Sequence, residues 1–325
     1  MILAGIDIGT NTLRLLVAKA GPDSFQELYS DRRITRLGQD LDRTGLISDA
    51  AADRSIAALI DFKKHIQRYS TIQTSAVGTS ALRNASNSDR FIAEVKQRTS
   101  VELFVISGEE EARLSLIGVA QALRGPGYPG KNDPLESSFV IDIGGGSTEI
   151  IMTRKGFAPV CMSLPLGAVY LTERFIKNDP PSSAEREQLG RAVRNELEKH
   201  SAVLRQDGAS ILIGTAGTIT TLAAIDLGVA AYDPFKINRH EMARDAVDRI
   251  VHDLGQRTLS ERRRMAGLEH GREDIILAGS IIVQALMERY GFGNILVSDW
   301  GLREGIVMDL YEKVLKGNTR VSSSG

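Results

Sequence analysis

Ile6-Asp7-Ile8-Gly9 lies near the start of the chain and recurs as Ile141-Asp142-Ile143-Gly144. An apolar run precedes each copy, and small or polar residues lead each copy into a second β-rich run. The second run ends at Gly21 in the first copy and at Gly156 in the second. Two such hairpins, each opening an α/β segment, indicate a duplicated fold whose halves face each other across a ligand cleft.

Short β-rich runs alternate with amphipathic stretches along the rest of the chain. This alternation favours an α/β fold, with a mostly parallel sheet covered by helices. The predicted strands lie at 1–9, 13–18, 73–77, 101–106, 138–143, 148–153, 159–164, 210–214 and 294–298. The predicted helices lie at 51–69, 88–98, 109–123, 167–177, 183–205, 216–227, 239–254, 272–290 and 301–316.

The turn-rich segment 125–136 is the expected linker between two domains. It separates a first domain, residues 1–124, from a second domain, residues 137–300. The last helix, about 301–317, is expected to return to the first domain, and residues 318–325 are expected to form a disordered tail.

The composition excludes several classes of protein. The 325 residues carry a formal net charge of −1, so no general attraction to nucleic acid is expected and any anion site is local. The single cysteine, Cys161, excludes an intrachain disulfide and a cysteine-based metal site. The chain lacks a run of about 20 apolar residues and a basic, apolar leader. We therefore expect a cytoplasmic protein without a membrane partner.

The second hairpin combines backbone donors with carboxylates. The N–H groups of Gly144, Gly145 and Gly146 can converge on a phosphate, and the hydroxyls of Ser147 and Thr148 can add donors. Two acidic residues, Asp142 and Glu149, flank this loop. A carboxylate beside a phosphate is repulsive unless a cation lies between them, and Mg²⁺ fits such a site.

The first hairpin and a later turn offer weaker signals of the same kind. Thr10, Asn11 and Thr12 can donate to an anion, whereas Asp7 either supports the metal through water or caps the turn. The segment Gly214–Thr218 follows a strand and opens a helix. It is either an anion site at a helix N-terminus or a simple strand-to-helix turn.

Three charged segments leave their roles open. Arg83 follows a strand and either clamps a phosphate or is solvated. The run Glu109–Glu111 opens a helix, where the helix dipole favours acidic residues. A phosphatase needs a carboxylate that orients water, but the residues alone do not choose among the three. The run Arg262–Arg264 is interpreted as a solvated face.

The sequence resembles the exopolyphosphatase and guanosine pentaphosphate phosphohydrolase (Ppx/GppA) family, in its short two-domain form. That family belongs to the actin-like (ribonuclease H-like, ASKHA) superfamily, and the similarity runs from Ile2 to about Tyr311. The segments that carry the resemblance are Asp7–Thr12, Thr79–Arg83, Ile106–Arg113, Asp142–Glu149, Ser163–Gly167, Gly214–Thr218 and Ser298–Gly305.

The resemblance implies a role for each site residue. Glu111 is the expected catalytic base and Arg83 the expected phosphate grip, while Asp142 and Glu149 are expected to hold Mg²⁺ or another divalent cation. Arg272 is expected to reach the cleft from the second domain, although Glu273 replaces the alanine usual in the family. The residues expected to bind the substrate are Thr10, Asn11, Thr12, Gly144, Gly145, Gly146, Ser147, Thr148 and Arg272.

The resemblance also implies an activity. We expect an exopolyphosphatase, a hydrolase that releases orthophosphate from the end of inorganic polyphosphate with the help of Mg²⁺, and we expect a homodimer. The alternatives are a guanosine pentaphosphate (pppGpp) 5′-phosphohydrolase, a kinase of the same superfamily, and a non-catalytic regulator that binds alarmones or polyphosphate.

Overall fold

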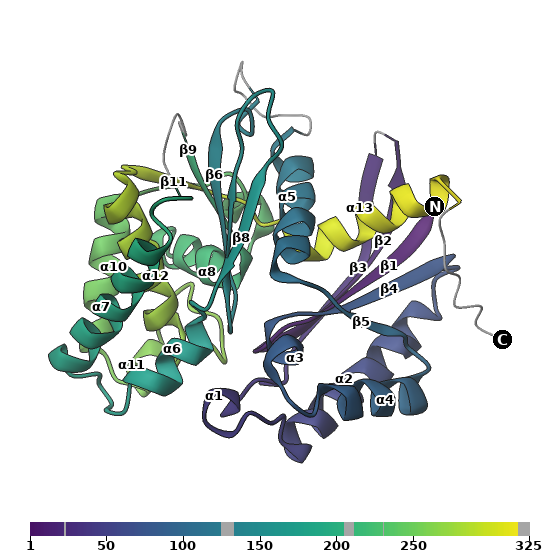
Figure 1. Ribbon diagram of the computed structural model, residues 1–325, viewed down its shortest axis with the longest axis horizontal. Helices are drawn as coiled ribbons and strands as arrows, with labels where there is room; N and C mark the ends of the chain where they lie inside the picture. The colour runs from purple at the N-terminus through teal and green to yellow at the C-terminus, as the bar shows by residue number, and fades with distance from the viewer. Residues whose placement is uncertain (23, 125–132, 205–210, 230, 318–325) are drawn as a thin grey trace. The chain divides into compact units, whose positions relative to one another are not determined.

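The computed structural model describes residues 1–22, 24–124, 133–204, 211–229 and 231–317 (Figure 1). It divides into two compact units. Unit 1 comprises Met1–Gly118 and the segment from Gly301, and unit 2 comprises Val119–Trp300. The predicted tail 318–325 and residues 125–132 of the predicted linker lie outside the described residues.

Unit 1 is built on a five-stranded mixed sheet with the order β3-β2-β1-β4-β5. Strands β1, β2 and β3 form an antiparallel meander, and β4 and β5 continue the sheet in parallel with β1. The strands are β1 (Ile2–Ile8), β2 (Thr12–Gly21), β3 (Ser24–Ile34), β4 (Gln73–Gly78) and β5 (Leu103–Val105). The helices are α1 (Leu41–Thr44), α2 (Asp49–Ile66), α3 (Ser80–Asn84), α4 (Ser88–Thr99), the first part of α5 (Gly108–Arg124) and α13 (Leu302–Leu315).

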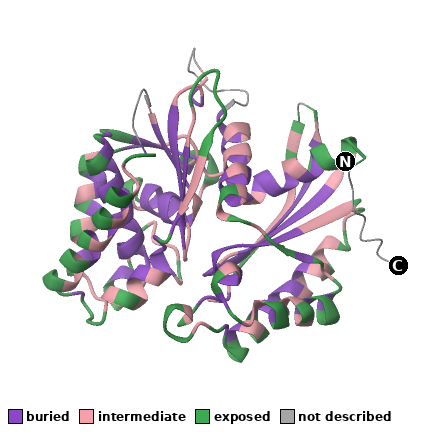
Figure 2. Cartoon of the chain, viewed as in Figure 1, coloured by how far each residue is buried: buried purple, intermediate pink, exposed green. Residues whose placement is uncertain are grey.

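Both faces of this sheet are buried under helices. Successive side chains of a strand point to opposite faces, so β1 contributes side chains to the core on each side. Ile6 of β1 packs in one cluster with Phe62 of α2, and Leu3 packs in another with Val307 and Leu310 of α13. Figure 2 shows the buried strands and the exposed outer turns of α2 and α4. Packing against helices on both faces holds β1 in place up to its end, where the first hairpin loop begins.

Unit 2 has a six-stranded mixed sheet with the order β10-β11-β9-β6-β7-β8. Its core includes Phe139 of β6, Leu212 of β9 and Leu286 of α12. The strands are β6 (Ser138–Ile143), β7 (Thr148–Met152), β8 (Val160–Leu164), β9 (Ile211–Thr215), β10 (Glu241–Ala243) and β11 (Asn294–Val297). The helices are α6 (Ala168–Phe175), α7 (Ser183–Lys199), α8 (Ala216–Asp226), α9 (Pro234–Ile237), α10 (Arg244–Gln256), α11 (Leu259–Arg262) and α12 (Ile276–Tyr290).

The two sheets share one topology. In each, an antiparallel three-stranded meander (β1-β2-β3 or β6-β7-β8) is followed by two parallel strands on the side of its first strand (β4-β5 or β9-β11). Unit 2 adds only the edge strand β10. The predicted duplicated α/β fold is therefore confirmed. None of the helices within the described ranges is long and apolar enough to cross a membrane.

Most predicted elements are present within a few residues. The helix predicted at 183–205 ends at Lys199, the short helices α1, α3, α9 and α11 were not predicted, and two further regions differ. No strand is predicted at β3, because no apolar alternation marks this edge strand, none of whose side chains is fully buried. The helix predicted at 239–254 begins only at Arg244. Arg239 has a left-handed φ of 68°, which interrupts the helix, and Glu241–Ala243 pair with β11 instead.

The interpretation of Arg262–Arg264 as a solvated face is wrong for Arg262, which is only 1% exposed. Its Nε donates to the Leu254 carbonyl at 2.9 Å and its Nη1 donates to the Glu273 carbonyl at 3.1 Å. Burial lowers the pKa of this guanidinium, although the charges of Asp179 and Asp274 act in the opposite direction. Arg262 thus joins α10, α11 and the segment that leads into α12.

We expect Arg262→Met to lower the free energy of unfolding by about 2–4 kcal/mol, because two buried carbonyl groups lose their donor. Urea denaturation followed by circular dichroism measures this loss. Arg264→Met is the matched control, since Arg264 is exposed, and its effect should stay within about 0.5 kcal/mol. Equal urea midpoints for the two variants would show that the hydrogen bonds of Arg262 to Leu254 and Glu273 do not stabilise the fold.

Candidate functional site

The two hairpin loops have the same backbone geometry. In unit 1 the N–H of Gly9 donates to the carbonyl of Thr12 at 3.1 Å, and in unit 2 the N–H of Gly144 donates to the carbonyl of Ser147 at 3.0 Å. The flanking strands pair antiparallel in matching register. The sequence repeat is therefore a structural repeat, with one loop in each unit.

The residues across from the two repeated aspartates differ in charge. Asp7 on β1 lies opposite Arg14 on β2, whereas Asp142 on β6 lies opposite Glu149 on β7. Asp142 and Glu149 are 6% and 0% exposed, and Glu149 Oε1 accepts a hydrogen bond from Ser163 Oγ at 2.7 Å. Cross-strand partners share one face of a sheet, and like charges placed this way repel. Unit 2 thus holds a buried pair of carboxylates that unit 1 lacks.

The glycine loop of unit 2 is held by its carbonyl groups. The first N–H groups of α6 donate to it, from Ala168 to the Gly144 oxygen at 3.0 Å and from Val169 to the Gly145 oxygen at 2.8 Å. In a trans peptide the N–H points away from the preceding C=O. The N–H groups of Gly145 and Gly146 therefore point away from α6, which is the orientation that an anion-binding loop requires.

The loop of unit 1 is held in a comparable way. The carbonyl of Thr10 accepts from the N–H of Gly38 at 2.9 Å, and the carbonyl of Asn11 accepts from the N–H of Thr35 at 3.1 Å. By the same peptide geometry the N–H groups of Asn11 and Thr12 point away from these partners. The predicted donors Thr10, Asn11 and Thr12 are all buried.

The structure distinguishes the three glutamates of α5. Glu109 is exposed, and Glu110 forms an ion pair with Arg113 at 2.7 Å. Glu111 alone is buried, with 7% exposure, and its Oε2 lies 2.7 Å from Arg83 Nη1. Burial and a cationic partner are typical of a carboxylate with a chemical role, and they separate Glu111 from its neighbours where the bare sequence could not.

Arg83 connects Glu111 to the adjoining strand end. Its Nη1 also donates to the carbonyl of Ile106 at 3.1 Å, so the guanidinium is fixed from two sides. Arg83 and Glu111, predicted as phosphate grip and catalytic base, are thus brought together in unit 1.

The remaining predicted residues of unit 2 lie around the glycine loop and the start of α8. Ser147 ends the glycine loop, and the hydroxyl of Thr148 donates to the carbonyl of Leu166 and supports the neighbouring segment. Arg272 lies against Gly217, where a Cβ would come within 1.9 Å of its Nη2. Arg272 Nε donates to Glu269 Oε2 at 2.7 Å.

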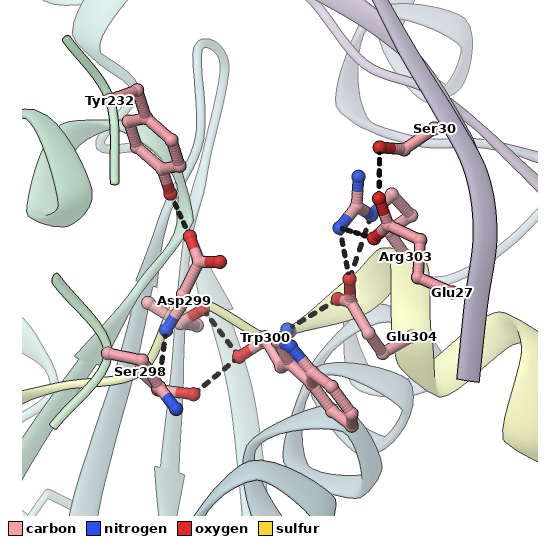
Figure 3. A network of polar contacts seen from close by, with 11 residues as sticks. Glu27, Ser30, Tyr232, Ser298, Asp299, Trp300, Arg303 and Glu304 are labelled. Carbon is pink, nitrogen blue, oxygen red and sulfur yellow. Dashed lines mark hydrogen bonds and ion pairs between the residues drawn. The ribbon is translucent and has the colours of Figure 1, made fainter. Parts of the chain in front are cut away.

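The carboxyl ends of β9 and β11 meet beside this helix start. The carbonyl of Trp300 accepts hydrogen bonds from Thr215 Oγ1 at 2.9 Å and from Ser298 Oγ at 2.7 Å. Asp299 accepts a hydrogen bond from the hydroxyl of Tyr232, as Figure 3 shows. Ser298–Gly305 and Gly214–Thr218, two of the segments that carry the family resemblance, are therefore joined by a hydrogen bond.

Sequence reasoning missed Arg14, Glu269 and the close packing of Gly167 against the glycine loop, where a Cβ on Gly167 would lie 2.3 Å from the Gly145 oxygen. The spacing that relates Asp7 to Asp142 also relates Arg14 to Glu149. The repeat alone could therefore have revealed that a basic residue in the first hairpin corresponds to an acidic residue in the second. Glu269 precedes Arg272 by three residues, which is a spacing typical of a local ion pair. Only the packing of α6 reveals Gly167.

The fold and the two loops define a class, the α/β proteins built from two similar halves with one hairpin loop of the same geometry in each. Comparison with known proteins narrows this class. The sequence profile of the Ppx/GppA phosphatase family matches residues 16–314. Exopolyphosphatase 2 of Mycobacterium tuberculosis is 33% identical over 321 residues, which cover 95% of this chain and 98% of that protein.

Two solved structures are similar over nearly their whole length. The Ppx/GppA family member of Aquifex aeolicus has 33% identity and a TM-score of 0.79, over 98% of this chain and 99% of that one. An exopolyphosphatase from Cytophaga hutchinsonii has 27% identity and a TM-score of 0.84, over 98% of each chain. The chain belongs to the Ppx/GppA phosphatase family, and it is a hydrolase.

Proposed function

We propose that the protein is an exopolyphosphatase, which hydrolyses the terminal phosphoanhydride of inorganic polyphosphate and releases orthophosphate. The observation that supports a phosphate substrate is the orientation of the glycine loop, whose N–H groups at Gly145 and Gly146 point away from α6. The similarity to exopolyphosphatase 2 supports the choice of polyphosphate.

In the proposed reaction the backbone N–H groups of the glycine loop bind phosphate oxygens. Glu111 orients a water molecule and takes its proton while the water oxygen attacks the terminal phosphorus. The bond to the bridging oxygen breaks, so the products are orthophosphate and a chain shorter by one unit. Arg83 holds Glu111 in position and balances its charge, and positioning and electrostatic stabilisation supply most of the acceleration.

Asp142 and Glu149 fit a divalent cation. They are buried cross-strand partners of like charge, an arrangement that a bound cation would stabilise. We propose that these two carboxylates hold Mg²⁺ together with phosphate oxygens and water. The bound ion would neutralise part of the phosphate charge.

The carboxylate pair predicts a metal effect on stability that does not depend on activity. We expect Mg²⁺ at about 100 times its Kd to stabilise the wild type by about 2.7 kcal/mol relative to EDTA. Asp142→Asn should lose this gain and should unfold at a higher temperature than the wild type in EDTA, because it removes one of two repelling charges. Differential scanning calorimetry measures both effects.

Glu187→Gln is the control for the metal experiment, since Glu187 is an exposed acid in a pair with Arg191. It should keep the full response to Mg²⁺. A wild type with equal unfolding temperatures in Mg²⁺ and EDTA would contradict the proposed metal site.

Phosphate release from long-chain polyphosphate, pppGpp and ATP, each with and without Mg²⁺, tests the proposed function. We expect the highest kcat/KM with polyphosphate and Mg²⁺. A higher kcat/KM with pppGpp would assign the protein to pppGpp hydrolysis, and tight binding without release would make it a regulator. The predicted homodimer and the cytoplasmic location stay predictions, and light scattering on the purified chain measures the first.

A further inference from the structure

The side chain of Arg272 is enclosed on two sides. Its guanidinium lies on Gly217, the only kind of residue that leaves room for it there, and its Nε binds Glu269 Oε2 at 2.7 Å. The Arg272 side chain is 7% exposed and the Glu269 side chain is 14% exposed. A phosphate that binds Arg272 must therefore displace one of these two neighbours. Gly217 contacts Arg272 through its backbone, which cannot move aside, so the side chain of Glu269 is the group that is displaced.

The surroundings of Arg272 favour an anion. Gly217 belongs to the first turn of α8, whose N-cap residue Thr215 provides no side-chain cap. The N-terminal end of a helix carries a partial positive charge, and a guanidinium beside it adds a full one. In the structure the carboxylate of Glu269 binds this cation at 2.7 Å.

We propose that Glu269 is an internal substitute for a substrate phosphate, which polyphosphate displaces when it binds Arg272. This inference rests on the proposed function, because it takes a phosphate chain as the ligand of Arg272. Carboxylate and phosphate both accept charge-assisted hydrogen bonds from one guanidinium, so they compete for the same donors. Glu269 thereby weakens substrate binding and sets the polyphosphate concentration at which the enzyme works.

The decisive variant is Glu269→Gln, which keeps the shape and an acceptor oxygen but removes the charge. We expect its Kd for tripolyphosphate to fall about three- to tenfold below that of the wild type, since a tenfold change corresponds to about 1.4 kcal/mol. Isothermal titration calorimetry with Mg²⁺, with both proteins carrying Glu111→Gln, measures binding while the loss of the proposed base suppresses turnover. Glu269→Asp keeps the charge on a shorter side chain, so it should show a smaller gain.

Two controls isolate the contact between Glu269 and Arg272. In an Arg272→Gln background, Glu269→Gln should give no further gain, because the contested donor is gone. Glu187→Gln removes the same charge from an exposed pair in unit 2 and should leave the Kd unchanged.

The possible outcomes separate this inference from the proposed function. A Kd that rises or stays constant in Glu269→Gln would overturn the competition, because an orienting role predicts weaker binding. Tighter binding without any phosphate release by the wild type would support the competition and overturn the hydrolase. Absence of tripolyphosphate binding by the wild type and by Glu269→Gln would overturn both.

Discussion

Replacing Glu111 by glutamine should lower kcat by about 10²–10⁴-fold and leave KM for polyphosphate within about threefold of the wild type. The removal of a positioned general base costs this much, whereas the phosphate ligands stay in place. Glutamine keeps an oxygen that can accept from Arg83, so the contact now at 2.7 Å is retained without the charge. Steady-state phosphate release separates kcat from KM.

The neighbouring glutamate provides the control. Glu109 stands on the same helical turn but is exposed, so Glu109→Gln should keep kcat within about twofold if only the buried carboxylate acts as the base. Turnover by Glu111→Gln at the rate of Glu109→Gln would remove Glu111 from the reaction. A rise in KM with an unchanged kcat would instead assign it to substrate binding.

Gly167→Ala should lower kcat/KM by about 10²-fold, because it displaces the glycine loop of unit 2. A Cβ on Gly167 would lie 2.3 Å from the carbonyl oxygen of Gly145 and 2.3 Å from backbone atoms of Gly146. These are backbone contacts, so the loop itself must move, and a shift of about 1 Å in a positioned group can cost this factor. Overpacking should also lower the free energy of unfolding by about 1–3 kcal/mol.

Gly293→Ala is the matched substitution, since a Cβ there meets no atom within 4 Å. It should leave both kcat/KM and the urea midpoint close to those of the wild type. Full activity in Gly167→Ala would show that the position of this loop does not limit the reaction. A lower free energy of unfolding together with full activity would show that Gly167 contributes to the stability of the fold and not to catalysis.

The sequence predicted the duplicated fold because the signal for it is local. Each hairpin carries its own glycines and flanking aspartate, and each buried strand has an apolar run that needs no distant partner to be recognised. Strand β3 had no such signal, because its sheet edge leaves its side chains only partly covered.

The candidate site could be predicted only in part. The position of Arg83 left a phosphate ligand and a solvated arginine open, and only the resemblance implied the phosphate ligand. Its contact with Glu111 joins residues of two different helices. Arg262 shows the same limit, since a run of three arginines favours a solvated face until the carbonyls of Leu254 and Glu273 are known to face the first of them. Pairings of this kind depend on the packing of the chain and have no local pattern.

The bonds at Trp300 have a practical consequence. The chain contains a single tryptophan, and its carbonyl accepts hydrogen bonds from Thr215 and Ser298 beside the start of α8. The tryptophan emission of the protein therefore comes from one known residue. A change in its wavelength or intensity during titration with polyphosphate would report events at that helix start without any added dye.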